Sequence, residues 1–117
     1  MKPHPRPNEV ALGSRANKTA YENWGLELTW GDMYELAEMV RKMETVVLYK
    51  VYDRKMPTHV HAAMWDGVVI PFEVTIDNTQ GFMIQAVLPV DALLSKRVLD
   101  GAYERMMRLG WLLRDNQ

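Results

Sequence analysis

The sequence predicts an α+β fold: a four-stranded antiparallel meander flanked by an N-terminal and a C-terminal helix, in the order α-β-β-β-β-α, preceded by an extended Pro-rich arm. Three observations predict it. Apolar residues recur at helical spacing in segments 30–43 and 92–114. Four stretches rich in β-branched and aromatic residues lie between these segments. Short turn signals separate the stretches, and strands joined by short turns pair antiparallel.

Length and composition indicate one globular domain over residues 18–117, behind an arm of residues 1–17. The chain has 117 residues, of which 48% are hydrophobic and 25% are charged, as in ordinary globular domains. It has no cysteine, which excludes disulfides and thiolate zinc sites. No stretch reaches the roughly 18 apolar residues of a membrane span, and no apolar core of a secretory signal is present. We therefore expect a cytoplasmic protein. If the chain is encoded by a bacteriophage, this means the cytoplasm of the host cell.

The first 17 residues are expected to form an extended basic arm. Pro3, Pro5 and Pro7 each fix φ, remove a hydrogen-bond donor and bias the preceding residue toward extended conformations. A short helix over residues 14–24 is a weaker alternative for the end of this segment.

The charge is distributed unevenly along the chain. Residues 1–20 carry a net charge of +3, residues 21–91 carry −6 and residues 92–117 carry +2. A basic arm and a basic tail therefore flank an acidic middle, on which they can dock in the same or a neighbouring subunit.

The first helix is expected at residues 30–43. Thr29 is a suitable N-cap, and Asp32 three residues later favours the same helix start. Helical spacing assigns the following residues to its buried side: Met33, Leu36, Met39, Val40 and Met43.

Asp66-Gly67 between two apolar runs predicts a two-residue hairpin turn, since a type I′ turn needs positive φ at both central positions. Such a turn pairs Trp65 with Val68. The pairs Ala63–Ile70, His61–Phe72 and His59–Val74 then share one face of the sheet with it.

The first strand carries apolar residues on both faces, and the second face of the hairpin is half apolar, so both faces need to be covered. Either one helix covers each face, or two helices cover one face and a second subunit covers the other. This pattern favours a homo-oligomer. Pro71 lacks a donor and favours an edge strand or a bulge.

The last helix, expected at residues 92–114 with Asp91 as its N-cap, carries exposed cations that are candidates for nucleic-acid contact. Asp100 and Glu104 interrupt this basic face, which favours a solvated helix surface instead. The candidate contact residues are Lys96, Arg97, Arg105 and Arg108. The apolar stripe expected on its other side consists of Leu94, Val98, Ala102, Met106, Leu109 and Leu113.

Catalytic chemistry has little support. His59 and His61 form an H-x-H pair on a strand that can bind zinc or iron if a third ligand joins them, but the register places Glu73 on the opposite face. Two serines and no glycine-rich phosphate loop are present, and Asp66 is expected in its turn rather than as a catalytic acid. We expect no cofactor and no enzymatic activity.

The leading hypothesis is a non-catalytic protein–protein interaction protein that self-associates and uses its arm to bind a neighbour or a target. Such a chain suits an assembly, for example as a phage virion part, or a small inhibitor of a host protein. The predicted contacts are Pro3, Pro5, Arg6 and Pro7 in the arm, with Trp24 and Trp30 as anchors. A small DNA-binding regulator and a metal-dependent enzyme using His59 and His61 are the alternatives.

Overall fold

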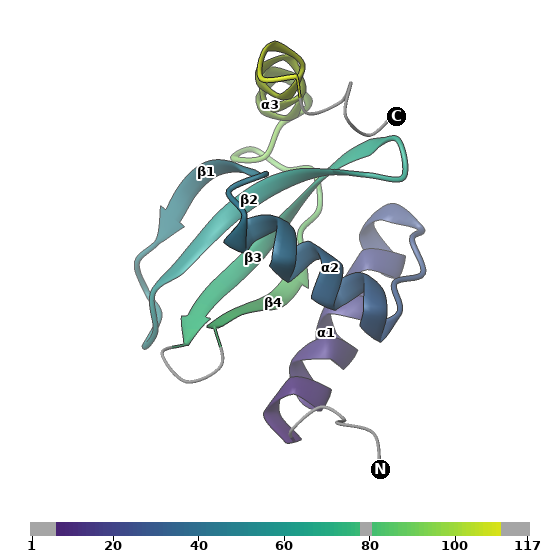
Figure 1. Ribbon diagram of the computed structural model, residues 1–117, viewed down its shortest axis with the longest axis vertical. Coiled ribbons are helices and arrows are strands. Elements are labelled where there is room, and N and C mark those ends of the chain that lie inside the picture. The colour runs from purple at the N-terminus through teal and green to yellow at the C-terminus, as the bar shows by residue number, and fades with distance from the viewer. Residues whose placement is uncertain (1–6, 78–80, 111–117) are drawn as a thin grey trace.

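The computed structural model describes residues 7–77 and 81–110 and confirms the α+β class (Figure 1). Two helices come first, then a meander of four antiparallel strands in the order β1-β2-β3-β4, then a C-terminal helix. The elements are α1 (Pro7–Trp24), α2 (Trp30–Arg41), β1 (Val46–Val51), β2 (Thr58–Trp65), β3 (Val68–Asp77), β4 (Gly81–Val87) and α3 (Lys96–Arg108). No helix in these described ranges is long and apolar enough to cross a membrane.

The β2–β3 hairpin has the predicted turn and register. Asp66 and Gly67 have φ values of 52° and 82°, as a type I′ turn requires. Trp65 pairs with Val68, and the pairing continues without a slip to Thr58 and Thr75. The turn therefore decides which side chains of the two central strands face which layer of helices.

Helix α2 begins with the predicted N-terminal signal. Thr29 Oγ1 accepts a hydrogen bond from the Asp32 amide at 3.1 Å, and an Asp32 carboxylate oxygen accepts one from the Thr29 amide at 2.9 Å. This capping box satisfies two amide groups that a helix start leaves without intrahelical partners. The helix buries Met33, Leu36 and Val40, but it ends at Arg41, and the Met43 side chain is exposed.

Helix α1 corrects the predicted arm, because residues 7–17 are helical rather than extended; residues 1–6 lie outside the described part. Pro7 occupies the first helical position, where its missing N–H has no helical partner to lose. Ala16 and Ala20, four residues apart, are fully buried in the core. Tertiary packing therefore stabilises a helix that the local proline pattern did not predict.

Helix α3 starts four residues later than expected, and residues 111–117 lie outside the described part. Asp91 is not the N-cap: its Oδ1 accepts from the Leu93 and Leu94 amides at 2.9 and 2.8 Å and closes a turn ahead of the helix. Ser95 is the N-cap.

The buried side of α3 also differs from the predicted stripe. Leu94, Ala102 and Met106 are buried as expected, but Leu99 is buried in place of Val98, and Leu109 is exposed. The reason is that a strict spacing of four residues drifts around a helix of 3.6 residues per turn.

The two faces of the sheet are covered by different helices of the same chain. α1 and α2 pack on the face that carries Ala63, Ile70 and Phe72, and form the larger core with it. Met106 of α3 and Ala102 pack on the other face, toward the hairpin end. The second face is therefore covered within one chain, so a second subunit is not needed to bury it.

Pro71 lies in the central strand β3, not at an edge. Its carbonyl accepts a hydrogen bond from the Leu88 amide at 2.9 Å, one residue beyond the end of β4. The N and C=O groups of one strand residue face the same neighbour, so the N–H that proline lacks would also face Leu88. The Leu88 carbonyl accepts a hydrogen bond from the Trp24 indole at 2.6 Å instead, so the missing donor leaves no unpaired acceptor there.

A pair of glycine substitutions tests the turn. Gly67→Ala should lower the free energy of unfolding by about 1–2 kcal/mol, because alanine is strained at positive φ. Gly101→Ala, within α3 and with no atom near the added Cβ, should raise it by about 0.5–1 kcal/mol. Urea unfolding monitored by circular dichroism measures both. Equal effects of the two substitutions would contradict the turn assignment.

Candidate functional site

The β4 edge of the sheet is closed by α1. Thr19 Oγ1 accepts the Val87 amide at 2.9 Å, Asn23 Nδ2 donates to the Val87 carbonyl at 2.8 Å, and the Trp24 indole donates to the Leu88 carbonyl at 2.6 Å. Three side chains of one helix thus satisfy the backbone at the end of the edge strand. Strand addition at this place is blocked.

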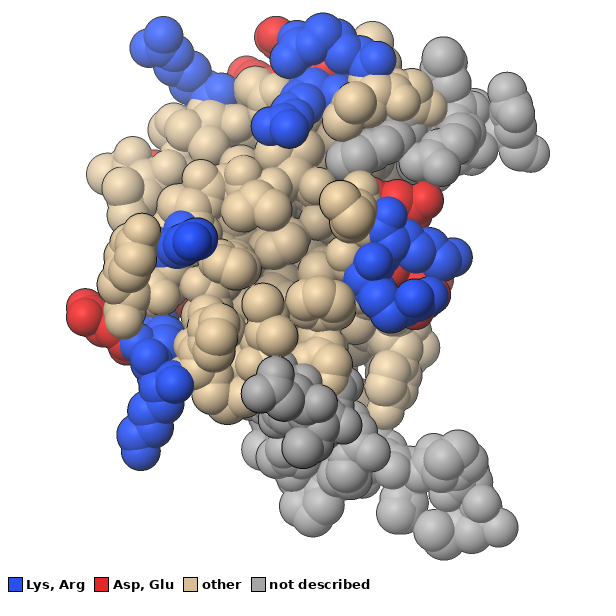
Figure 2. All heavy atoms as spheres, turned by 60° about the vertical axis from the view of Figure 1, so that its left-hand side comes forward, with Lys and Arg blue, Asp and Glu red and all other residues tan. Residues whose placement is uncertain are grey.

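At the opposite edge, β1, no helix of the described residues closes the strand in this way. Met43 and Tyr52 flank the strand with exposed fractions of 80% and 84%, and Val47 within it is 54% exposed. With Met56 in the following loop they form what we call the β1 surface. Figure 2 brings the β1 side of Figure 1 forward and shows a broad uncharged area, with Lys and Arg at its margins and within it and with Asp and Glu beside several of them at the margins.

The shape of β1 favours contact through side chains rather than strand addition. The register shifts between Val47 and Tyr49, so Leu48 forms a bulge, and Lys50 lies exposed on the strand. A bulge and an edge lysine are features that hinder edge-to-edge pairing of backbones. A partner would therefore contact the apolar side chains of this edge strand and not its backbone amides.

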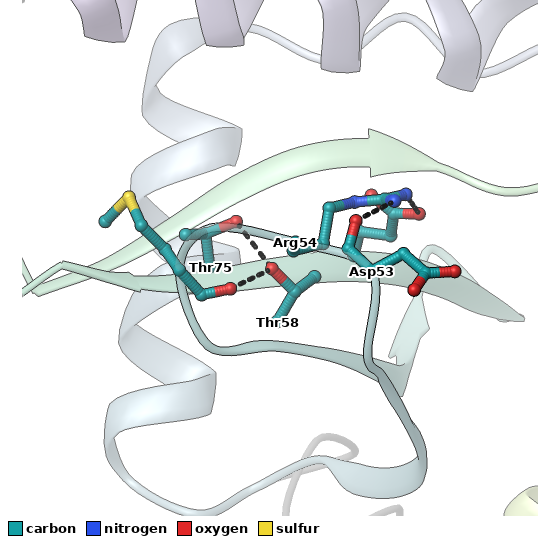
Figure 3. Close-up of polar contacts among 6 residues, drawn as sticks. Asp53, Arg54, Thr58 and Thr75 are labelled. Carbon is teal, nitrogen blue, oxygen red and sulfur yellow. Dashed lines mark hydrogen bonds and ion pairs between the residues drawn. The ribbon is translucent and has the colours of Figure 1, made fainter.

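The loop after β1 is held against the sheet by a polar cluster (Figure 3). Thr58 Oγ1 lies 3.0 Å from the Met56 carbonyl, to which it donates, and 3.5 Å from Thr75 Oγ1. Arg54 donates to the Asp53 carbonyl at 3.2 Å and pairs with the buried Glu73 carboxylate at 3.3 Å. These bonds fix the loop that presents Tyr52 and Met56.

The same cluster is poorly suited to catalysis. Glu73 is paired with a guanidinium, which satisfies a carboxylate that burial would otherwise penalise. Burial raises the pKa of Tyr49, and the negative charges of Asp91 and Glu73 raise it further, so its phenol stays neutral. A neutral phenol beside a carboxylate that is held in an ion pair is a poor general base and a poor nucleophile at neutral pH.

His59 and His61 lie on the predicted face with their rings 6.1 Å apart. His61 is buried: its Nδ1 lies 2.7 Å from Thr45 Oγ1 and its ring stacks on Phe72. Burial, with a smaller effect from His59, lowers the pKa of His61 to about 4. Among the described side chains, those of residues 15–76 and 81–110, no three His, Asp or Glu form a group that can hold a metal ion.

The other predicted site residues are dispersed. Trp24 packs against its own core and donates to Leu88, whereas Trp30 is 37% exposed at the start of α2. Pro3, Pro5 and Arg6 lie outside the described residues, and Pro7 is the first residue of α1. The four candidate nucleic-acid contacts on α3 are exposed: Lys96, Arg97, Arg105 and Arg108. Asp100 and Glu104 lie on the same helix surface, which therefore carries both charges and is not purely basic.

The β1 surface is the site that sequence reasoning missed. The available signal was apolar residues on both phases of segment 44–53, which was interpreted as a sheet buried on both faces. No protein-family model, no curated protein and no solved structure matches this chain.

A hydroxyl deletion tests how β4 is closed. Thr19→Val keeps the shape of the side chain but leaves the Val87 amide without its acceptor, and should lower the free energy of unfolding by about 1–3 kcal/mol. Lys18→Ala, at an exposed position of the same helix, is the matched control and should change it by less than about 0.5 kcal/mol. Chemical unfolding of both variants gives the comparison. An unchanged free energy of unfolding in T19V would contradict the role of Thr19 in closing the β4 edge.

The buried His61 predicts a pH dependence of stability. Its pKa is lowered in the folded state, so the unfolded chain takes up the proton first as pH falls. Stability is complete above pH 6.5 and should fall toward pH 4 by at most roughly 3 kcal/mol. Unfolding at several pH values should show this fall in the wild type and in His59→Gln, but a reduced fall in His61→Gln. If the stability of H61Q decreased by the same amount toward pH 4, the decrease would have to come from other titrating groups.

Proposed function

We propose that this chain is a non-catalytic protein–protein interaction protein that self-associates through the β1 surface. The observation that supports the proposal is the placement of Met43, Val47 and Tyr52, three large apolar side chains left in solvent along one side of the sheet. Single exposed apolar residues are common, but a grouped set with a polar border is typical of an interaction site.

The covering of the rest of the sheet supports the same choice. α1 closes the β4 edge through Thr19, Asn23 and Trp24, and both faces are covered by helices of the chain. The β1 side is one of two places where apolar side chains remain exposed for a partner; the other is α3 with the segment before it, where Leu93, Met107 and Leu109 are exposed. A rigid loop, held by Arg54 and Thr58, limits the conformational entropy lost when a partner binds.

The arm keeps a place in this proposal. Pro3, Pro5 and Arg6 precede α1, and Trp30 is exposed on α2, so the arm contacts to a neighbour or target proposed from the sequence are retained. A part of a larger assembly such as a virion, or a small inhibitor of a host protein, needs only such complementary surfaces.

Two substitutions on the β1 surface test self-association. In Met43→Asn/Tyr52→Ser the changed side chains are almost fully exposed, and asparagine tolerates the positive φ of residue 43, so stability should change by less than about 0.5 kcal/mol. Self-association should weaken at least about tenfold, since apolar contact area is lost. Light-scattering mass after size exclusion, over a range of concentrations, measures it against the 13.6 kDa of one chain.

Two controls make the result specific. Val90→Ser/Leu93→Ser removes two exposed apolar side chains from the segment between β4 and α3 and should leave the mass unchanged. A chain lacking residues 2–6 separates a contribution of the arm, whereas a truncation to Lys18 would remove most of α1. A wild-type protein that stays at 13.6 kDa at all concentrations would contradict self-association.

A further inference from the structure

Helix α2 carries a second surface, with the charge opposite to that bordering the β1 surface. Segment 26–40 contains four carboxylates and no Lys, Arg or His. Trp30 and Tyr34, four residues apart and therefore on one side of the helix, are 37% and 52% exposed. We call Trp30, Tyr34 and the neighbouring Glu27 and Glu35 the α2 surface.

Two of the four carboxylates are already engaged. Asp32 belongs to the capping box with Thr29, and Glu38 forms ion pairs with Arg41 and Lys42. Glu27 and Glu35 are exposed and form no ion pair with any residue of the described part. The α2 surface therefore offers two aromatic rings beside two free negative charges.

The β1 surface offers the complement. Arg54 is engaged by Glu73, but Lys50 and Lys55 are exposed and form no ion pair with a described residue. Lys50 lies on β1 three residues after Val47, and Lys55 lies in the following loop beside Met56; the exposed Asp53 lies between the two lysines in the sequence. Methionine adapts to aromatic rings, and lysine ammonium groups can pair with carboxylates or lie over indole and phenol faces.

We infer that the occupant of the β1 surface is the α2 surface of a second copy of this chain, with Lys50 and Lys55 facing Glu27 and Glu35. This inference rests on the proposed self-association and names its contact. Charge complementarity favours a second copy over contact of β1 with β1, which would bring lysines together.

The two surfaces lie on consecutive elements of the chain, which allows a closed dimer. Residues 42–45 alone separate the end of α2 from the start of β1. A twofold axis near this junction lets the β1 surface of each copy meet the α2 surface of the other, so that each contact occurs twice. The assembly then closes at two copies instead of growing into a filament.

Reciprocal charge reversal tests the contact. Lys50→Glu/Lys55→Glu places negative charges against Glu27 and Glu35, and Glu27→Lys/Glu35→Lys places positive charges against Lys50 and Lys55. Each variant alone should dissociate at least about tenfold more readily than wild type, because like charges face each other. Mixed together they should form a heterodimer, in which both contacts again join opposite charges. Native mass spectrometry, with one of the two variants labelled with nitrogen-15, distinguishes the heterodimer by mass.

The outcomes separate this inference from the proposed function. Loss of dimer in each variant and its recovery in the mixture support the contact; Lys96→Glu/Arg97→Glu on α3 is the control and should dimerise normally. If wild type dimerises and M43N/Y52S does not, but the charge-reversed variants dimerise normally, the β1 surface is used and the α2 contact is wrong. If each variant dissociates and the mixture stays monomeric, the pairing of these charges is also wrong.

Discussion

The two-residue turn at Asp66 and Gly67 sets the register of β2 and β3, and through it the side of the sheet on which each central side chain lies. A slip of one residue would exchange the two faces of the hairpin and bring the buried Glu73 to the face that now carries Phe72. Because both faces are largely apolar in the observed register, both need a layer of helices. The arrangement of α1 and α2 on one face and α3 on the other follows from this requirement.

The covering of the sheet is asymmetric at its edges. At the end of β4, three side chains of α1 form hydrogen bonds with the backbone. They are a hydroxyl, an amide and an indole, and their partners are the Val87 amide and the carbonyls of Val87 and Leu88. β1 instead carries a bulge at Leu48 and an exposed Lys50, which hinder strand addition but leave apolar side chains in solvent. Both backbone edges are therefore protected, while apolar side chains at β1 stay exposed, and this is the surface proposed for association.

Local signals predicted the parts of the fold that local chemistry decides. The hairpin register, the capping box of α2 and the four strands followed from turn residues, side-chain periodicity and cap residues. Helix α1 was predicted only in part, as a short helix over residues 14–24; its start at Pro7 was not, because the prolines favour an extended arm and the packing of Ala16 and Ala20 on a sheet far away in the sequence has no local signal. The β1 surface was missed because apolar residues on both phases of a strand predict burial, although the predicted meander already placed this strand at an edge.

Amide hydrogen exchange at low and high protein concentration tests the central claim most directly. The account predicts that β1 amides and the following loop exchange quickly in dilute solution and several-fold more slowly in concentrated solution, because a second copy covers them. The β4 amides next to α1 should be protected at both concentrations. Exchange in β1 that does not depend on concentration, together with slowing elsewhere, would contradict the assignment of the β1 surface.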